Sequence, residues 1–225
     1  MRLPALVAAA AVAVLALSVL VAFGRPPAPA AALASGEPPD LAAVPTPEAP
    51  VFTIIDVAPY VVRGRTAEEI LLSLRRRGPK ADGAEFFGLT ETQMAFTYNT
   101  VQGEAGCTLE GLRLDLHVAV TLPEWQDRAR APRTLAREWD RFERALRQHE
   151  DTHREIAERG AREAYHVLRS MRQPSCEGID EAARELATRV RERNEARQHA
   201  YDRRTRHGRT EGAVWPQGAR HHARR

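Results

Sequence analysis

The stretch LAREWDRFERALRQHEDTHREI, residues 135–156, decides the fold of this chain. Its large apolar side chains recur in steps of three or four residues or their multiples: Leu135, Trp139, Phe142, Leu146 and Ile156. This period predicts an amphipathic helix with one buried face. Proline is favoured in the first turn of a helix and excluded from its interior, so we expect the helix to begin at Pro132 and to end before Pro174.

Two histidines fall on the same buried face. Counting from Leu146, steps of three and four residues reach His149 and then His153. Neutral imidazoles one helical turn apart can bind one zinc ion, and a glutamate beside the first can deprotonate the water on the metal. This H-E-x-x-H pattern predicts His149 and His153 as Zn²⁺ ligands and Glu150 as the catalytic base. The alternative is a pair of partly buried histidines bonded to neighbouring side chains.

A catalytic zinc site also requires a third protein ligand and one open position for water. A second helix is predicted from about Asp180 to about Arg204, and Glu181 or Glu185 on it is one source of that ligand. The segment YDRRTRHG, residues 201–208, is another, because it lies where this helix ends and a glycine allows a sharp turn.

Within this segment we expect His207 to be the third ligand, with Asp202 as the alternative. Asp202 could instead orient a ligating imidazole through its other ring nitrogen. Tyr201 and Thr205 are expected to hydrogen-bond substrate or to cap the helix, and capping is the preferred interpretation. The alternative for His207 is an exposed loop histidine.

The remaining elements predict an α+β fold. We expect a small, mainly antiparallel sheet packed against two long helices, the first of which is a zincin-like metal helix. A capping box at Thr66–Glu69 opens a short helix that Gly78 and Pro79 end. The strands follow β-branched content or alternating apolar residues, and cover residues 51–55, 60–62, 92–101 and 112–120. His117 falls on the polar face of the last strand, so we expect it at the surface.

The two ends of the chain differ in composition from its centre. Residues 1–24 carry a long apolar run at 3–23, which predicts a signal peptide or an uncleaved N-terminal membrane anchor. Residues 25–50 are a Pro/Ala-rich linker, 51–215 the folded domain, and 216–225 a basic tail. The domain is therefore expected to be secreted or periplasmic, with or without membrane anchoring.

The two cysteines, Cys107 and Cys176, favour a structural disulfide over a metal site in an exported chain without C-x-x-C spacing. The chain has 33 cationic and 30 acidic residues, mostly interleaved along predicted helices. This pattern is typical of a solvated helix face and gives no reason to expect a nucleic-acid partner. The expected partner is a peptide or protein substrate, and no oligomeric state follows from the sequence.

The segment from about Tyr60 to Ala213 resembles a bacterial domain-of-unknown-function family described as predicted secreted zinc-dependent proteases. The matching features, in chain order, are Cys107, Thr121-Leu122-Pro123-x-Trp125, Trp139 and Phe142, His149-Glu150-x-x-His153, Cys176, and Tyr201-Asp202-x-x-Thr205-x-His207-Gly208. The resemblance implies zinc binding and peptide hydrolysis.

We therefore expect an exported zinc-dependent metallopeptidase that hydrolyses peptide bonds with a Glu-activated zinc-bound water. The alternatives are a zinc amidase acting on cell-wall peptide and a zinc-stabilised binding or scaffold domain without turnover.

Overall fold

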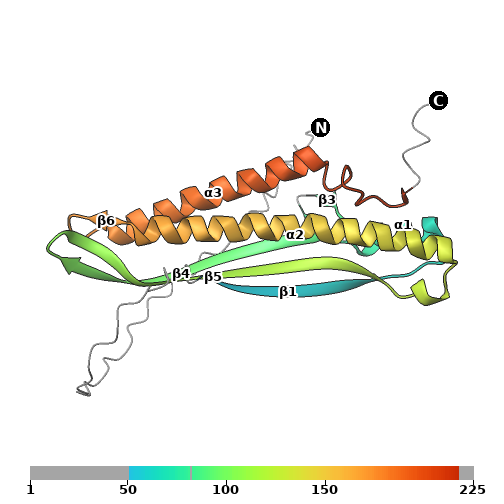
Figure 1. Ribbon diagram of the computed structural model, residues 1–225, viewed down its shortest axis with the longest axis horizontal. Helices are drawn as coiled ribbons and strands as arrows, with labels where there is room; N and C mark the ends of the chain where they lie inside the picture. Colours follow the sequence, from blue (N-terminus) through green and yellow to red (C-terminus); the bar gives the residue numbers. More distant parts are fainter. Residues whose placement is uncertain (1–50, 82, 218–225) are drawn as a thin grey trace, which may run out of the picture.

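The computed structural model describes residues 51–81 and 83–217 (Figure 1). The predicted leader and linker, and all but two residues of the predicted basic tail, lie outside these ranges. Of the helices in the described part of the chain, none combines the length and the apolar character that membrane crossing requires.

A four-stranded sheet forms one layer of the molecule. Its strands are β1 (Val51–Val62), β4 (Leu89–Gly103), β5 (Gly106–Trp125) and the short β6 (Arg172–Gln173). The order is β1-β5-β4, with β6 pairing the start of β5; β1 is parallel to β5 and the other two pairings are antiparallel. The prediction of an α+β fold with a mainly antiparallel sheet is confirmed.

The three long strands, β1, β4 and β5, all extend beyond their sequence signals. β1 is continuous through the gap expected between residues 55 and 60, because Pro59 lies on an edge strand, where a missing N–H is tolerated. β5 has 20 residues and continues past residue 120 to Trp125. Its even-numbered side chains from Leu112 to Leu122 are buried and the alternation that predicted this strand holds.

Two long helices form the second layer. α2 (Arg133–Arg169) covers the sheet and α3 (Ile179–Thr205) lies along α2 (Figure 1). Both spans match the expected helices to within one residue at the starts, and Pro132 is the residue before α2. The shorter elements are α1 (Ala67–Arg77), the β2–β3 hairpin (Lys80–Ala81 with Ala84–Glu85) and a 3-10 turn, η1 (Arg128–Arg130).

The predicted cap of α1 is confirmed. The Thr66 hydroxyl accepts a hydrogen bond from the Glu69 N–H at 3.2 Å. The Glu69 carboxylate in turn accepts one from the Arg65 N–H at 2.7 Å, so both side chains satisfy backbone donors at the start of the helix.

α2 and α3 approach closely because α2 carries small residues on the side facing α3. A Cβ at Gly160 would lie 2.7 Å from the Oδ1 of Asn194 on α3. Ala157, Ala161 and Ala164 are also buried along α2. This close packing fixes the phase of α3 relative to α2, and therefore which of its side chains can meet the histidines.

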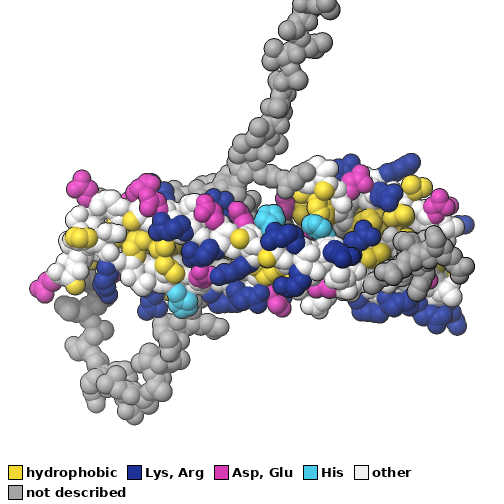
Figure 2. Space-filling model, turned by 90° about the horizontal axis from the view of Figure 1, so that it is seen from above, with side chains coloured by type: hydrophobic (Ala, Val, Ile, Leu, Met, Phe, Trp, Pro, Cys, Tyr) yellow, Lys and Arg dark blue, Asp and Glu magenta, His cyan; other side chains and the backbone are white. Residues whose placement is uncertain are grey.

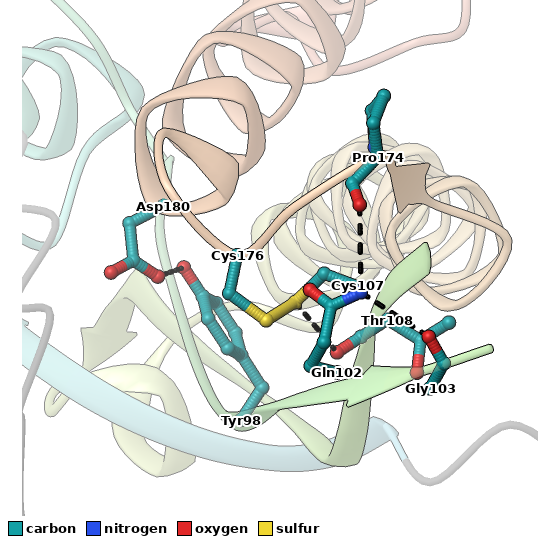
Figure 3. The surroundings of a disulfide bond; sticks show 8 residues. All are labelled: Tyr98, Gln102, Gly103, Cys107, Thr108, Pro174, Cys176 and Asp180. Carbon is teal, nitrogen blue, oxygen red and sulfur yellow. Dashed lines mark hydrogen bonds between the residues drawn. A yellow bond between two sulfur atoms is a disulfide. The ribbon is translucent and has the colours of Figure 1, made fainter. Parts of the chain in front are cut away.

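A disulfide joins Cys107 on β5 to Cys176 in the loop before α3 (Figure 3). The two cysteines are 69 residues apart in the sequence, and the bond links the sheet to the loop that leads into α3. Beside it the Tyr98 hydroxyl donates a hydrogen bond to Asp180 at 3.0 Å (Figure 3). The start of α3 is thus attached to the sheet at the end of the molecule where β4 turns into β5.

Candidate metal centre

Three potential ligand atoms converge between α2 and α3. The Nε2 atoms of His149 and His153 lie 3.2 Å apart. The Oδ1 of Asp202 on α3 lies 3.3 Å from the first and 3.1 Å from the second. Within residues 51–81 and 83–217 this is the one group of three metal-binding side chains whose ligand atoms lie within 4.8 Å of one another.

The other nitrogen of each imidazole faces a hydrogen-bond acceptor. His149 Nδ1 lies 3.0 Å from the Glu211 carboxylate, and the Tyr201 hydroxyl also donates to that carboxylate, at 2.9 Å. His153 Nδ1 lies 2.6 Å from the Oε1 of Gln198, whose Nε2 donates to the His153 carbonyl at 3.0 Å. Each Nδ1 must therefore carry a proton, and in the neutral ring this leaves the Nε2 lone pair directed at the centre of the triangle.

This arrangement fits a metal cation. Two lone pairs and a carboxylate oxygen within 3.3 Å of one another repel unless a positive charge lies between them. A single proton can form a hydrogen bond across only one of the three edges of this triangle and leaves the other two edges repulsive. Zinc with ligand bonds of about 2.0–2.1 Å in a tetrahedral arrangement requires ligand atoms about 3.3–3.4 Å apart, and the edges of this triangle are close to that length.

The charges of the group depend on burial and on these contacts. Burial alone would raise the pKa of Asp202, but without a metal, hydrogen bonds from the Nε2 atoms of His149 and His153, which require a proton on Nε2, hold that pKa well below its usual range. Burial lowers the pKa of His153, and its hydrogen bonds to Asp202 and Gln198 outweigh that effect and raise it. The carboxylate is thus ionised at neutral pH, as a metal ligand must be.

The third member of this group is Asp202, the predicted alternative, and not His207. The His207 Nδ1 lies 3.4 Å from the same Asp202 oxygen, but its side chain is 59% exposed and stays outside the group. His207 follows the end of α3 in a left-handed conformation (φ 53°), which turns it away toward Phe86. The physical reason for the difference is phase: residue 202 is still helical and faces α2, whereas residue 207 is past the helix end.

The other candidates for the third ligand lie far from the histidines. Glu181 and Glu185 precede Asp202 by 21 and 17 residues on α3, which corresponds to about 25–32 Å at about 1.5 Å per residue. Their side chains are exposed and pair with arginines of the same helix. His117 is at the surface as expected, 2.6 Å from the Asp56 carboxylate.

Glu150 is buried and lines the same cavity as the two histidines. Its Oε2 accepts a hydrogen bond from the Thr90 hydroxyl at 2.8 Å. A Cβ at Gly88 would lie 2.7 Å from its other oxygen, so glycine is what allows the chain to pass so close. Burial raises the pKa of Glu150, while the hydrogen bond from Thr90 lowers it.

The segment after α3 folds back against the first histidine. Gly208 has φ +72°, and a Cβ there would lie 3.0 Å from the His149 ring. The Thr205 hydroxyl accepts a hydrogen bond from the Gly208 N–H at 3.2 Å and donates to the Tyr201 carbonyl at 3.0 Å, so Thr205 caps the helix. The Tyr201 ring stacks on His149 with centroids 4.9 Å apart. Burial raises the pKa of Tyr201 to about 12, which keeps its hydroxyl a donor.

Sequence reasoning missed three polar residues of this centre. Gln198 lies one turn before Asp202, and this i, i+4 spacing is a signal that could have identified it. Thr90 and Glu211 are 60 and 62 residues from their partners in α2, and no local pattern relates them. Both require the tertiary structure.

The cavity around the site is open. It has a volume of about 680 Å³ and is lined by residues of the β2–β3 hairpin, the start of β4, α2 and the end of α3. Figure 2 shows the face of the molecule seen from above α3, where acidic and basic side chains alternate with hydrophobic patches. The arrangement can hold a cation at His149, His153 and Asp202 with a carboxylate beside it and access from solvent.

No curated protein and no solved structure matches this chain. The model of a family described as bacterial proteins of unknown function (DUF922) matches residues 57–208, which is more than half of the chain. This segment contains the three converging side chains, Glu150 and both cysteines. Because the match covers more than half of the chain, the protein belongs to that family.

Proposed function

We propose that this protein is a zinc-dependent peptidase that acts outside the cytoplasm. The observation that carries the proposal is the triangle of His149 Nε2, His153 Nε2 and Asp202 Oδ1, with edges of 3.1–3.3 Å and both imidazole tautomers fixed by acceptors. A carboxylate acceptor on a ligating histidine is the usual partner in zinc sites. Zinc is the ion that tetrahedral nitrogen and oxygen ligands at this spacing suit.

The surroundings favour a catalytic site over a structural one. Structural zinc sites are closed by four protein ligands, whereas catalytic sites keep one position open. Here three ligand atoms face a cavity of about 680 Å³, and Glu150 lines the same cavity. These features support hydrolysis more than a zinc-stabilised scaffold.

A zinc ion bound at this triangle would supply Lewis acidity, which lowers the pKa of a coordinated water toward about 7. The chain supplies the proton transfers. Glu150 accepts a proton from the water while the water oxygen bonds to the peptide carbonyl carbon. Glu150 then delivers that proton to the amine nitrogen as the C–N bond breaks. Thr90 holds the Glu150 carboxylate in place through its 2.8 Å hydrogen bond.

The disulfide and the apolar N-terminal run support an extracytoplasmic location. Disulfides persist in secreted and periplasmic proteins and are rare in the cytosol. The Cys107–Cys176 bond and the apolar residues 3–23 together support export, with or without retention at the membrane.

Glu150→Gln tests the proposal. The protein and this variant are loaded with zinc, their metal content is measured by mass spectrometry, and both are assayed on a quenched fluorescent peptide library and on cell-wall peptides. We expect equal zinc content and a loss of turnover of about 10²- to 10⁴-fold in Glu150→Gln. Glu155→Gln, an exposed position on the same helix, is the matched control and should retain activity.

Two results would overturn the proposal. If wild type and Glu150→Gln are equally active, or both inert on every substrate, the catalytic role is wrong and the scaffold alternative gains support. If correctly folded wild-type protein takes up no zinc, the scaffold alternative is excluded as well.

A further inference from the structure

A second cavity, of about 340 Å³, continues from the metal centre between β4 and α3. We call it the apolar groove, and its walls include Met94, Phe96, Leu116 and Ala187. Thr92 and Gln198 line both the apolar groove and the cavity of the metal centre. The two spaces therefore share a border, and Gln198 at that border also holds His153.

The lining of the apolar groove follows from strand geometry. Alternate side chains of a strand point to the same face, so Thr92, Met94 and Phe96 form one row along β4. Thr90, which holds Glu150, is the preceding member of this row. One strand face thus runs from the carboxylate of the metal centre into the apolar groove.

The charges at the rim of the groove are already paired. Arg191 forms an ion pair with Glu195 at 3.0 Å, and Arg184 pairs with Glu181. Such exposed pairs leave little unbalanced charge to attract a charged ligand. The apolar walls therefore determine which ligand the groove prefers, and they favour an apolar ligand.

The distance from the metal centre sets which part of a peptide would reach the groove. The apolar walls begin beyond Gln198: Met94 follows Thr90 by four residues on β4, and Ala187 precedes Asp202 by 15 residues on α3. At about 3.3 Å per residue in a strand and about 1.5 Å per residue in a helix, these walls lie about 13 and 22 Å from the metal centre. An extended peptide advances about 3.3 Å per residue, so these distances correspond to about four to seven residues.

We propose that the apolar groove binds a bulky apolar side chain of the substrate, about four to seven residues from the bond that is cleaved. The inference rests on the proposed peptidase function and adds its specificity. A leucine- or phenylalanine-sized side chain should bind about 10- to 100-fold more tightly than serine at the same position, because its apolar surface leaves water.

Binding to the Glu150→Gln protein, incubated with zinc, tests this inference separately from turnover. The probes are fluorescein-labelled peptides of 16 residues with Leu, Phe or Ser placed four to seven residues from the centre, on either side, and the readout is fluorescence anisotropy. Thr188→Trp, at the exposed rim, and Ala187→Trp, in the wall, fill the groove. Glu192→Trp adds the same side chain to an exposed position of the same helix outside the groove.

We expect Leu and Phe peptides to bind about 10- to 100-fold more tightly than Ser peptides, and Thr188→Trp to remove most of this difference while Glu192→Trp keeps it. Equal binding of all peptides, or the same preference in Thr188→Trp, would overturn the inference.

A second contrary outcome is that the protein binds no peptide but self-associates with increasing concentration, and that Thr188→Trp abolishes this self-association. The groove would then bind a second copy of the chain, and the inference would be overturned too. Apolar preference in binding without any hydrolysis by the wild type would retain the groove and overturn the proposed function alone.

Discussion

Replacement of Asp202, the proposed third ligand, is the sharpest test of the candidate metal centre. Asp202→Ala removes one of three converging atoms, 3.1–3.3 Å from both imidazole nitrogens. Zinc sites with four ligands bind with about 10–16 kcal/mol, which corresponds to about 2.5–4 kcal/mol for each ligand. Asp202→Ala should therefore weaken zinc binding by about 10²- to 10³-fold, because each 1.4 kcal/mol is a factor of ten.

His207→Ala is the matched comparison. Its side chain is 59% exposed and its Nδ1 contacts the Asp202 carboxylate at 3.4 Å without joining the group of ligands. We expect a change in zinc affinity of less than about threefold, in line with the small effect of an exposed ion pair. Affinity is measured by competition with a chromophoric chelator at pH 7.5. If His207→Ala loses zinc and Asp202→Ala retains it, the assignment of the third ligand from this geometry is refuted.

Three further predictions concern packing, redox state and pH. Gly208→Ala places a Cβ 3.0 Å from the His149 ring at φ +72°, so it should lower stability by about 1 kcal/mol or more and also lower zinc affinity, as measured by thermal melts and zinc titrations. Gly212→Ala, also at positive φ but 3.5 Å from its nearest neighbour, should lower stability alone. Replacing both cysteines by serine should destabilise the protein by about 4 kcal/mol in urea unfolding, since the bond closes a loop of 69 residues; an unchanged midpoint would contradict this. Because folding raises the pKa of His153, protonation of His153 stabilises the metal-free protein below about pH 6.5, and this stabilisation is lost as pH rises through the raised pKa. Zinc competes with the same proton, so it binds more tightly at higher pH. Melting temperatures should therefore fall from pH 6 to 8 without zinc and rise over the same range with zinc.

The elements that sequence patterns predicted are those set by local periodicity. The steps of three and four residues around Leu146 located α2 and the shared face of His149 and His153, because both follow from one helix alone. The alternation along β5 located that strand for the same reason. These predictions required no knowledge of what packs against the element.

The third side chain of the candidate metal centre could not be chosen from the sequence because it depends on how two helices meet. Asp202 and His207 lie five residues apart, and both belong to the segment that was singled out. The contact of Gly160 with Asn194 sets the phase of α3 on α2, and the left-handed residues at its end redirect the chain before position 207. Neither feature has a local sequence signature that gives the outcome.

A disulfide lies near the start of α3, and the proposed metal centre lies near its end. Cys176 lies three residues before its start and Asp202 three residues before its end. A reductant would break the disulfide, and a chelator would remove the zinc ion that we propose, so the reducing, zinc-buffered interior of a cell would leave this helix without either attachment. Under the proposed function and export, a nascent chain would gain both attachments only outside the cell that makes it, and the proteins of that cell would be protected from cleavage.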